Sequence, residues 1–163
     1  MAEKKLQTDD AAEFRVNEKK WTPTLMKAGW TAIPSVIFER QLALGLDPLD
    51  INILLHIASY WWSKDSKPFP SKVTIAKAIG KDPRTIQRRI ARLEAGTLIR
   101  REERRISKVG SKTNIYHLDG LIEAAKPYAL EKIQARADEA AARAARAGRK
   151  GKPKLRVVAS DEE

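Results

Sequence analysis

Cysteine is absent from this sequence, and so is any long apolar run. The lack of cysteine excludes a disulfide framework and a thiolate zinc site. No apolar stretch is long enough to span a membrane, and the N-terminal residues lack the apolar segment of a secretory signal. We therefore expect a soluble, cytoplasmic protein without a membrane partner. Its 163 residues allow one domain with a hydrophobic core, plus tails.

The sequence also lacks the residue groups that catalysis on DNA requires. A nicking or recombining enzyme needs a nucleophile with metal ligands or an arginine cluster. No paired-histidine motif or carboxylate cluster accompanies the tyrosines, which are Tyr60, Tyr116 and Tyr128. His56 has no second metal ligand near it, and we interpret His117 as structural. We predict that the protein is not an enzyme and uses no metal or other cofactor.

Positive charge is in excess, and it is localised. The formal net charge is +11, yet residues 1–70 hold 9 basic and 9 acidic side chains. Residues 71–118 hold 13 basic against 4 acidic side chains, and residues 119–163 hold 10 against 8. A charge that serves solubility would spread over the surface, whereas a site for a polyanion concentrates it. The pattern predicts nucleic-acid binding by residues 71–118.

The stretch Pro70–Gly96 has the pattern of two short helices joined by a tight turn. Ser71 is placed to cap the first helix, and Gly80 lets the chain reverse because glycine accepts a positive φ. Asp82 and the proline after it form a cap and a first-turn proline, which start the second helix, and a glycine ends it. Each of the two helices has apolar side chains on one side only, and two sides of this kind pack on each other only if the helices cross at a steep angle. This arrangement predicts a helix-turn-helix.

The second helix, residues 83–95, has a core stripe and a polar face. Ile86, Ile90 and Leu93 recur at the spacing of one buried side. The opposite side presents Arg84, Thr85, Gln87, Arg88 and Arg92. Arginine reads guanine and glutamine reads adenine in a major groove, while threonine suits a phosphate oxygen. A basic helix face can also be plain solvated surface, but the turn, both caps and the outward Gln and Thr together favour DNA contact.

Two short strands are predicted after this helix, at Leu98–Ile99 and Ile115–Leu118. A β-hairpin directly behind a recognition helix is a wing, and its tip is placed to reach phosphates or the minor groove. The basic residues expected at the tip are Arg104, Arg105, Lys108 and Lys112.

The region before Pro70 is expected to contain a flexible arm and two helices. Residues 1–28 are polar with little periodicity, and Trp21 with Leu25 and Met26 would pin this arm to the body or to a second subunit. The DNA-binding domain is expected over residues 29–126. Within it, one helix is predicted from Pro34 to Gly45 and another from Asp47–Pro48 to about Trp62.

The second of these helices is apolar over more than half of its circumference. Ile51, Leu54 and Leu55 belong to its predicted core side. Leu49, Ile53 and Tyr60 flank a narrow polar stripe and would be partly exposed in a monomer. This surplus of apolar surface leads us to expect a homodimer.

The region after the hairpin is expected to be helical and then disordered. Asp119 is placed to cap a short helix, and Pro127 predicts a break or a fresh start. Residues 127–147 are alanine-rich and predict a projecting helix that frays or pairs with a partner. Residues 148–163 read as a disordered tail. The basic residues of the alanine-rich region would add phosphate contacts or form a solvated face, with nothing to favour either; they are Arg136, Arg143, Arg146, Arg149 and Lys150.

The order of these elements resembles the winged helix-turn-helix proteins of bacteria and of their phages and plasmids. The resemblance rests on PSKVTIAKAIG, DPRTIQRRIARLEAGTLIR and TNIYHL, which are similar to GntR-type regulators and to the helix-turn-helix modules of phage and plasmid replication proteins. Those families usually have Ser-Arg-x-Thr-Val where this chain has Asp82–Ile86. The resemblance implies that Arg84, Thr85, Gln87 and Arg88 meet DNA and that residues 104–112 form the wing tip. No effector domain of GntR type is expected after Leu118, which argues against a metabolite-sensing regulator.

Our leading hypothesis is a transcription regulator that binds specific double-stranded DNA in the nucleoid as a homodimer. The recognition helix 83–95 would enter the major groove, and the wing 104–112 would contact the minor groove or backbone. The alternative is a plasmid or phage replication-initiation or partition protein, whose C-terminal helix recruits a replication or transcription protein. The expected DNA-binding residues are Ser71, Lys72, Lys81, Arg84, Thr85, Gln87, Arg88, Arg92, Arg104, Arg105, Lys108 and Lys112.

Overall fold

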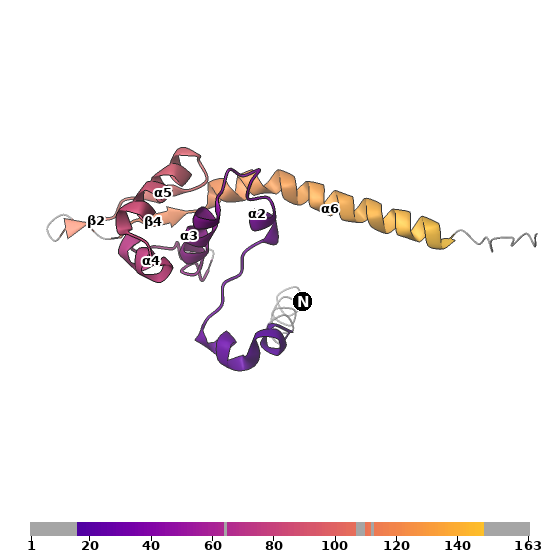
Figure 1. Cartoon of the computed structure of the whole chain (residues 1–163), viewed down its shortest axis with the longest axis horizontal. Coiled ribbons are helices and arrows are strands. Elements are labelled where there is room, and N and C mark those ends of the chain that lie inside the picture. The colour runs from indigo at the N-terminus through magenta and orange to yellow at the C-terminus, as the bar shows by residue number, and fades with distance from the viewer. Residues whose placement is uncertain (1–15, 64, 107–109, 112, 149–163) are drawn as a thin grey trace, which may run out of the picture. The chain divides into compact units, whose positions relative to one another are not determined.

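The computed structural model describes residues 16–63, 65–106, 110–111 and 113–148. After a helical segment at residues 16–28, the helices are α2 (Ser35–Glu39), α3 (Pro48–Ala58), α4 (Lys72–Ile79), α5 (Pro83–Ala95) and α6 (Asp119–Gly148). Between α5 and α6 lie the strands β1 (Arg100–Glu102), β2 (Arg105–Ile106), β3 (Gly110–Ser111) and β4 (Ile115–His117) (Figure 1). This order confirms the predicted fold, a mainly helical winged helix-turn-helix with a small hairpin.

The core lies where α3, α4 and α5 pack together. Ile53 and Ile57 of α3 and Ile86 and Ile90 of α5 have no solvent exposure, and Ile75 of α4 has 1%. Burying a side chain of this size contributes roughly 1.5–3 kcal/mol. The three helices are therefore held mainly by interlocking isoleucines, and the stripe predicted for α5 is confirmed.

The helix-turn-helix itself forms as its local residues predict. The Oγ of Ser71 accepts a hydrogen bond from the Thr74 amide at 2.9 Å, and Asp82 accepts one from the Arg84 amide at 2.7 Å. Gly80 ends α4 in the left-handed conformation, with φ of 72°. Each cap satisfies a backbone donor that the first turn of a helix leaves unpaired.

The predicted faces of α3 are correct for Leu54 and Tyr60 but wrong for Ile53 and Leu55. Ile53 was expected to be partly exposed, but it is fully buried, whereas Leu55 is 37% exposed. The cause is Asp50, which is fully buried because it faces arginines of α5. A carboxylate on the core-facing side of the helix turns the neighbouring apolar residues to positions that hydrophobicity alone does not predict.

The region before α3 also departs from the sequence-based expectation. Residues 16–28 are helical, and Met26 is buried with 5% exposure; residues 1–15 lie outside the described residues. The helix predicted from Pro34 to Gly45 is shorter, because α2 ends at Glu39 and turns follow. Arg40 and Gln41 stand where the apolar stripe of α2 would continue, so nothing pulls a second helical turn onto the core.

The hairpin forms, although its first strand begins later than predicted. β1 pairs antiparallel with β4, with Arg101 opposite Tyr116, and β2 pairs with β3 further out. Leu98 and Ile99 are not in the strand, because both of their amides bond to the Leu93 carbonyl and close the end of α5. On the other side of β4, the Tyr116 amide donates to the carbonyl of Pro68 at 2.8 Å.

The C-terminal helix is continuous where a break was expected. α6 runs from Asp119 to Gly148 with Pro127 inside it, so the predicted break is wrong. Residues with high helix propensity on both sides outweigh the single hydrogen bond that proline removes. The chain divides into two compact units, Met1–Ala125 and Lys126–Glu163. In the part of the chain that the structure describes, no helix has the length and apolar composition needed to cross a membrane.

The backbone at the beginning of α6 packs directly on the backbone of the turn that follows α5. A Cβ on Gly120 would stand 1.8 Å from the Thr97 carbonyl oxygen, which is far inside van der Waals contact. Nearby, the Leu121 amide donates to the Leu98 carbonyl at 2.7 Å. Gly120 is therefore required by the close approach of two backbones.

Replacing Gly120 by alanine is expected to destabilise the protein by about 3 kcal/mol, because the methyl group forces the two backbones apart. Urea unfolding followed by circular dichroism measures this change. Gly96→Ala is the matched control, because its Cβ would find only ordinary contacts of 3.5 Å or more. Equal stability of the Gly120 and Gly96 variants would contradict the proposed backbone contact.

Candidate nucleic-acid interface

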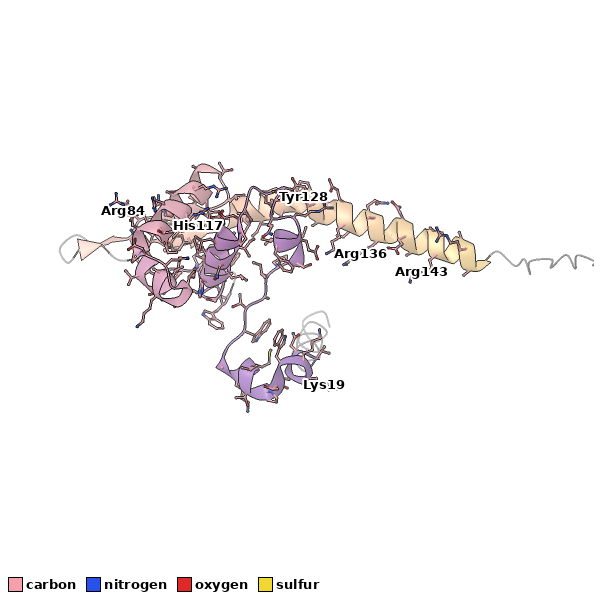
Figure 2. All side chains as sticks on the ribbon, in the orientation of Figure 1. Lys19, Arg84, His117, Tyr128, Arg136 and Arg143 are labelled. Carbon is pink, nitrogen blue, oxygen red and sulfur yellow. The ribbon has the colours of Figure 1, made fainter. Side chains whose placement is uncertain are left out.

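The outer face of α5 carries four of the predicted DNA-binding side chains. Arg84, Gln87 and Arg88 are exposed, and Thr85 is half-buried. Figure 2 shows the Arg84 side chain extending outward from the helix. One guanidinium nitrogen of Arg88 lies 3.5 Å from the Thr85 hydroxyl, a long contact that leaves Arg88 free to move. These side chains together offer hydrogen-bond donors at positions that a major groove can reach.

The N-terminal end of α4 adds to this face. Ser71 uses its hydroxyl as the helix cap, and Lys72 donates from Nζ to the Oε1 of Gln87 at 2.9 Å. Lys81, in the turn between α4 and α5, is exposed. Basic groups from both α4 and α5 thus lie beside Gln87.

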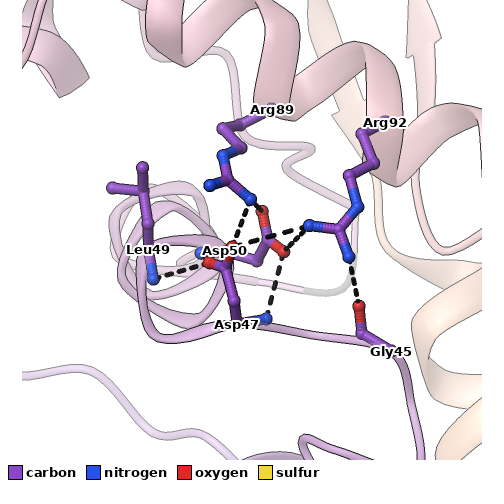
Figure 3. A network of polar contacts seen from close by, with 6 residues as sticks. All are labelled: Gly45, Asp47, Leu49, Asp50, Arg89 and Arg92. Carbon is purple, nitrogen blue, oxygen red and sulfur yellow. Dashed lines mark hydrogen bonds and ion pairs between the residues drawn. The ribbon is translucent and has the colours of Figure 1, made fainter.

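Arg92 lies one helical turn beyond Arg88 and is exposed, but its guanidinium group also has partners within the protein. Its Nη1 lies 3.1 Å from the Asp50 carboxylate, and its Nη2 donates to the Gly45 carbonyl at 2.9 Å (Figure 3). Arg89 forms an ion pair with Asp47 and lies 3.6 Å from Asp50. These two arginines tie α5 to the beginning of α3, so their guanidinium groups are engaged within the protein.

The acidic partners are held in place by a capping box. One carboxylate oxygen of Asp47 accepts from the amides of Leu49 and Asp50, both at 2.9 Å, and Asp50 accepts from the Asp47 amide at 3.1 Å. Partial burial raises the pKa of Asp47, but the Asp50 amide and the charge of Arg89 outweigh it and hold that pKa below its ordinary value. The sequence signal of this box is Asp47-x-x-Asp50, of which only the first member was predicted as a cap.

Asp50 is the central member of this network. Its side chain is fully buried, and its Oδ1 has the Arg89 ion pair but no hydrogen bond within the described residues. A buried carboxylate is tolerated only when cations or donors surround it. The network therefore engages Arg89 and Arg92 within the protein, and Arg84, Gln87 and Arg88 are the exposed donors of α5 beside them.

A second ion pair fixes the hairpin to α5. Glu94 accepts from the backbone amide of Arg101 at 3.0 Å and from its Nε at 2.7 Å. The side-chain hydrogen bonds with Arg101 lower the pKa of Glu94, against the opposing effect of burial. Across the hairpin, the Nε2 of His117 lies 2.8 Å from Glu102, a contact that fits the structural role expected for this histidine. The base of the wing is thus tied to the end of the recognition helix.

The wing is described only in part. Arg104 lies over the ring of Phe69, with 5.2 Å between the guanidinium carbon and the ring centroid. Arg105 is in β2, and its side chain is not described. Lys108 and Lys112 lie outside the described residues. The structure brings together the residues of α4 and α5, and the DNA contacts of the wing remain predictions.

Comparison with known proteins identifies the module. Residues 44–99 match a family model described as a helix-turn-helix domain. Among solved structures, the N-terminal domain of the DnaD protein from Geobacillus kaustophilus HTA426 is similar, with a TM-score of 0.50 and 18% sequence identity. The likeness covers 73% of this chain and 96% of that chain, and it concerns the fold alone. No curated protein matches the sequence. The chain carries a helix-turn-helix domain, a module whose partner is DNA.

Replacing Asp50 by asparagine is expected to destabilise the protein by about 2 kcal/mol. The loss is smaller than for a fully buried ion pair, because the Arg89 and Arg92 side chains are 31% and 53% exposed. The unfolding free energy in urea at neutral pH measures it. Asp82→Asn is the control, because asparagine caps a helix about as well as aspartate. An Asp50→Asn variant with an unchanged unfolding free energy would show that the carboxylate charge does not hold α5.

Proposed function

We propose that the protein is a transcription regulator that binds specific double-stranded DNA, of the bacterial or mobile-element kind that its sequence resembles. The observation that carries the proposal is the division of arginines around α5. Arg89 and Arg92 pair with the buried carboxylate of α3, whereas Arg84 and Arg88 are exposed to solvent one helical turn apart. A helix that is fixed by some of its arginines and presents others to solvent is suited to a major groove.

The proposed mechanism is occupancy of a promoter, without catalysis. α5 enters the major groove, and the wing, residues 104–112, contacts the minor groove or backbone beside it. The net charge of residues 71–118 supplies sequence-independent attraction to phosphates, and α5 supplies the base contacts. Because Glu94 ties β1 to α5, the helix and the wing would bind as one rigid surface.

A homodimer on a repeated or palindromic site is part of this proposal. Ile53 of α3 is buried, but Tyr60 is 39% exposed, and further apolar surface lies before α2. Trp21, Leu25 and Trp30 are 62%, 57% and 48% exposed, and they line an open hollow of about 1010 Å³. Large exposed aromatic side chains grouped in this way are typical of a protein interface.

Selection of bound fragments from random DNA tests the proposal. Wild-type protein is expected to select one sequence, present as two half-sites if the protein binds as a homodimer. Arg84→Ala and Arg88→Ala are each expected to weaken binding by about 1–3 kcal/mol and to relax the preference at one base pair. Lys108→Ala is expected to weaken all sequences alike. Equal losses on selected and random DNA for all three variants would refute the base-reading role of α5.

The alternative, a replication-initiation or partition protein, uses the same DNA-binding surface. It is favoured by Leu130 and Ile133 of α6, which are 66% and 63% exposed in the second compact unit and offer an apolar contact to another protein. Removing residues 127–163 is expected to leave DNA affinity and promoter control unchanged if the protein is a regulator. Loss of plasmid or phage maintenance with retained promoter control would instead establish the alternative.

A further inference from the structure

Gln87 is the glutamine of the recognition face, and its amide orientation is fixed by a neighbour. Lys72 Nζ lies 2.9 Å from Oε1 of Gln87. An ammonium group has only donors, so the atom that faces it must be the amide oxygen and not the nitrogen. The amide nitrogen, with its two hydrogens, is therefore left to face other groups.

The position of Lys72 is unfavourable for α4. It is the first residue of this helix, where the positive end of the helix dipole disfavours a cation. The lysine is also only half-exposed. The stability of α4 therefore does not explain why the ammonium group of Lys72 is held here by an exposed glutamine of another helix. The same ammonium group is well placed to meet an anionic or acceptor-rich partner.

The hydrogen bond changes what Gln87 can recognise. To read adenine, a glutamine accepts from the N6 amino group through Oε1 and donates to N7 through Nε2. Here the ammonium group of Lys72 takes one of the two lone pairs of Oε1, so an N6 amino group on the other lone pair would lie beside a positively charged donor. Guanine presents two acceptors, N7 and O6, at the same edge. The ammonium of Lys72 and the amide nitrogen of Gln87 can donate to one acceptor each.

We propose that Lys72 and Gln87 form one composite donor pair that selects guanine and rejects adenine at a single base pair of the target. This inference rests on the proposed function, because it assigns a base to a helix that is proposed to enter the major groove. It corrects the simple expectation from the sequence that an outward glutamine reads adenine. It also makes a residue of α4 a determinant of specificity, although α5 is the recognition helix.

The test compares the base preferences of variants by selection from random DNA. Gln87→Ala first locates the base pair, as the position whose preference disappears. Wild-type protein is expected to prefer guanine there by roughly 10-fold over adenine, within the range for a bidentate base contact. Lys72→Met keeps the length of the side chain and removes the ammonium group, so Oε1 becomes free. The preference at that position is then expected to change from guanine to adenine.

Lys77→Met is the matched control, because it removes the same charge from another exposed position of α4. It is expected to weaken binding without changing any base preference. A Lys72→Met variant that still prefers guanine, or a wild type that prefers adenine, overturns the composite pair and leaves the proposed function standing. A wild type without preference at any position overturns both.

The hydrogen bond is also measurable without DNA. In the free protein, the side-chain amide protons of Gln87 are expected to shift in the NMR spectrum of Lys72→Met and to stay in place in Lys77→Met. Unchanged Gln87 amide signals in the Lys72 variant overturn the pair, whatever the DNA experiments give. A thermal melt of each variant confirms that the fold is retained.

Discussion

The geometry of the proposed DNA-binding surface depends on the ion pairs between α5 and the beginning of α3. Asp50 is buried and needs positive charge around it, and Arg89 and Arg92 supply that charge from one side of α5. This requirement sets the rotation of α5 about its axis. The arginines of one amphipathic helix are thereby sorted into two sets, one that holds the helix and one that is presented to solvent.

Such a network contributes more to orientation than to stability. The removal of charges from water opposes much of the Coulombic attraction, so a buried pair adds little net free energy compared with apolar packing. Isoleucines of α3 and α5 already hold the two helices together, but apolar contacts tolerate sliding and rotation better than directed hydrogen bonds do. The carboxylate of Asp50 and the Gly45 carbonyl specify where each guanidinium must lie. A recognition helix needs this kind of definition, because base contacts depend on the position of individual atoms.

The features that could be predicted from the sequence are those set by neighbouring residues. Ser71, Gly80 and Asp82 act within a few positions of themselves, and each behaves as its chemistry predicts. The features that were missed depend on residues far apart in the chain. Arg92 and its partner Asp50 are 42 positions apart, and Asp50 is buried on the same helix as Ile53, which was predicted to be partly exposed. Nothing in the local sequence distinguishes Arg92 from Arg88.

The roles of Gly120 and Lys72 also depend on residues that lie elsewhere in the chain. Gly120 looks like an ordinary residue near a helix start, and only the approach of the Thr97 carbonyl explains it. Lys72 looks like one more basic residue until its bond to a side chain of another helix is seen. Charge counting indicates a basic region that overlaps the helix-turn-helix domain, because it sums over many residues. It could not assign individual roles, because these depend on which groups the fold brings within 3 Å or so of one another.

The prolines beside β4 have a consequence for how the protein behaves in a crowded cell. The carbonyl of Pro68 extends the hairpin by one hydrogen bond from Tyr116, so the segment around it forms the outer edge of the small sheet. Proline has no amide hydrogen, and Pro68 and Pro70 are both buried with exposed Phe69 between them. This edge therefore offers few donors to an incoming strand from another molecule. Sheets that end in this way are protected from edge-to-edge aggregation, even where an aromatic side chain is exposed beside them.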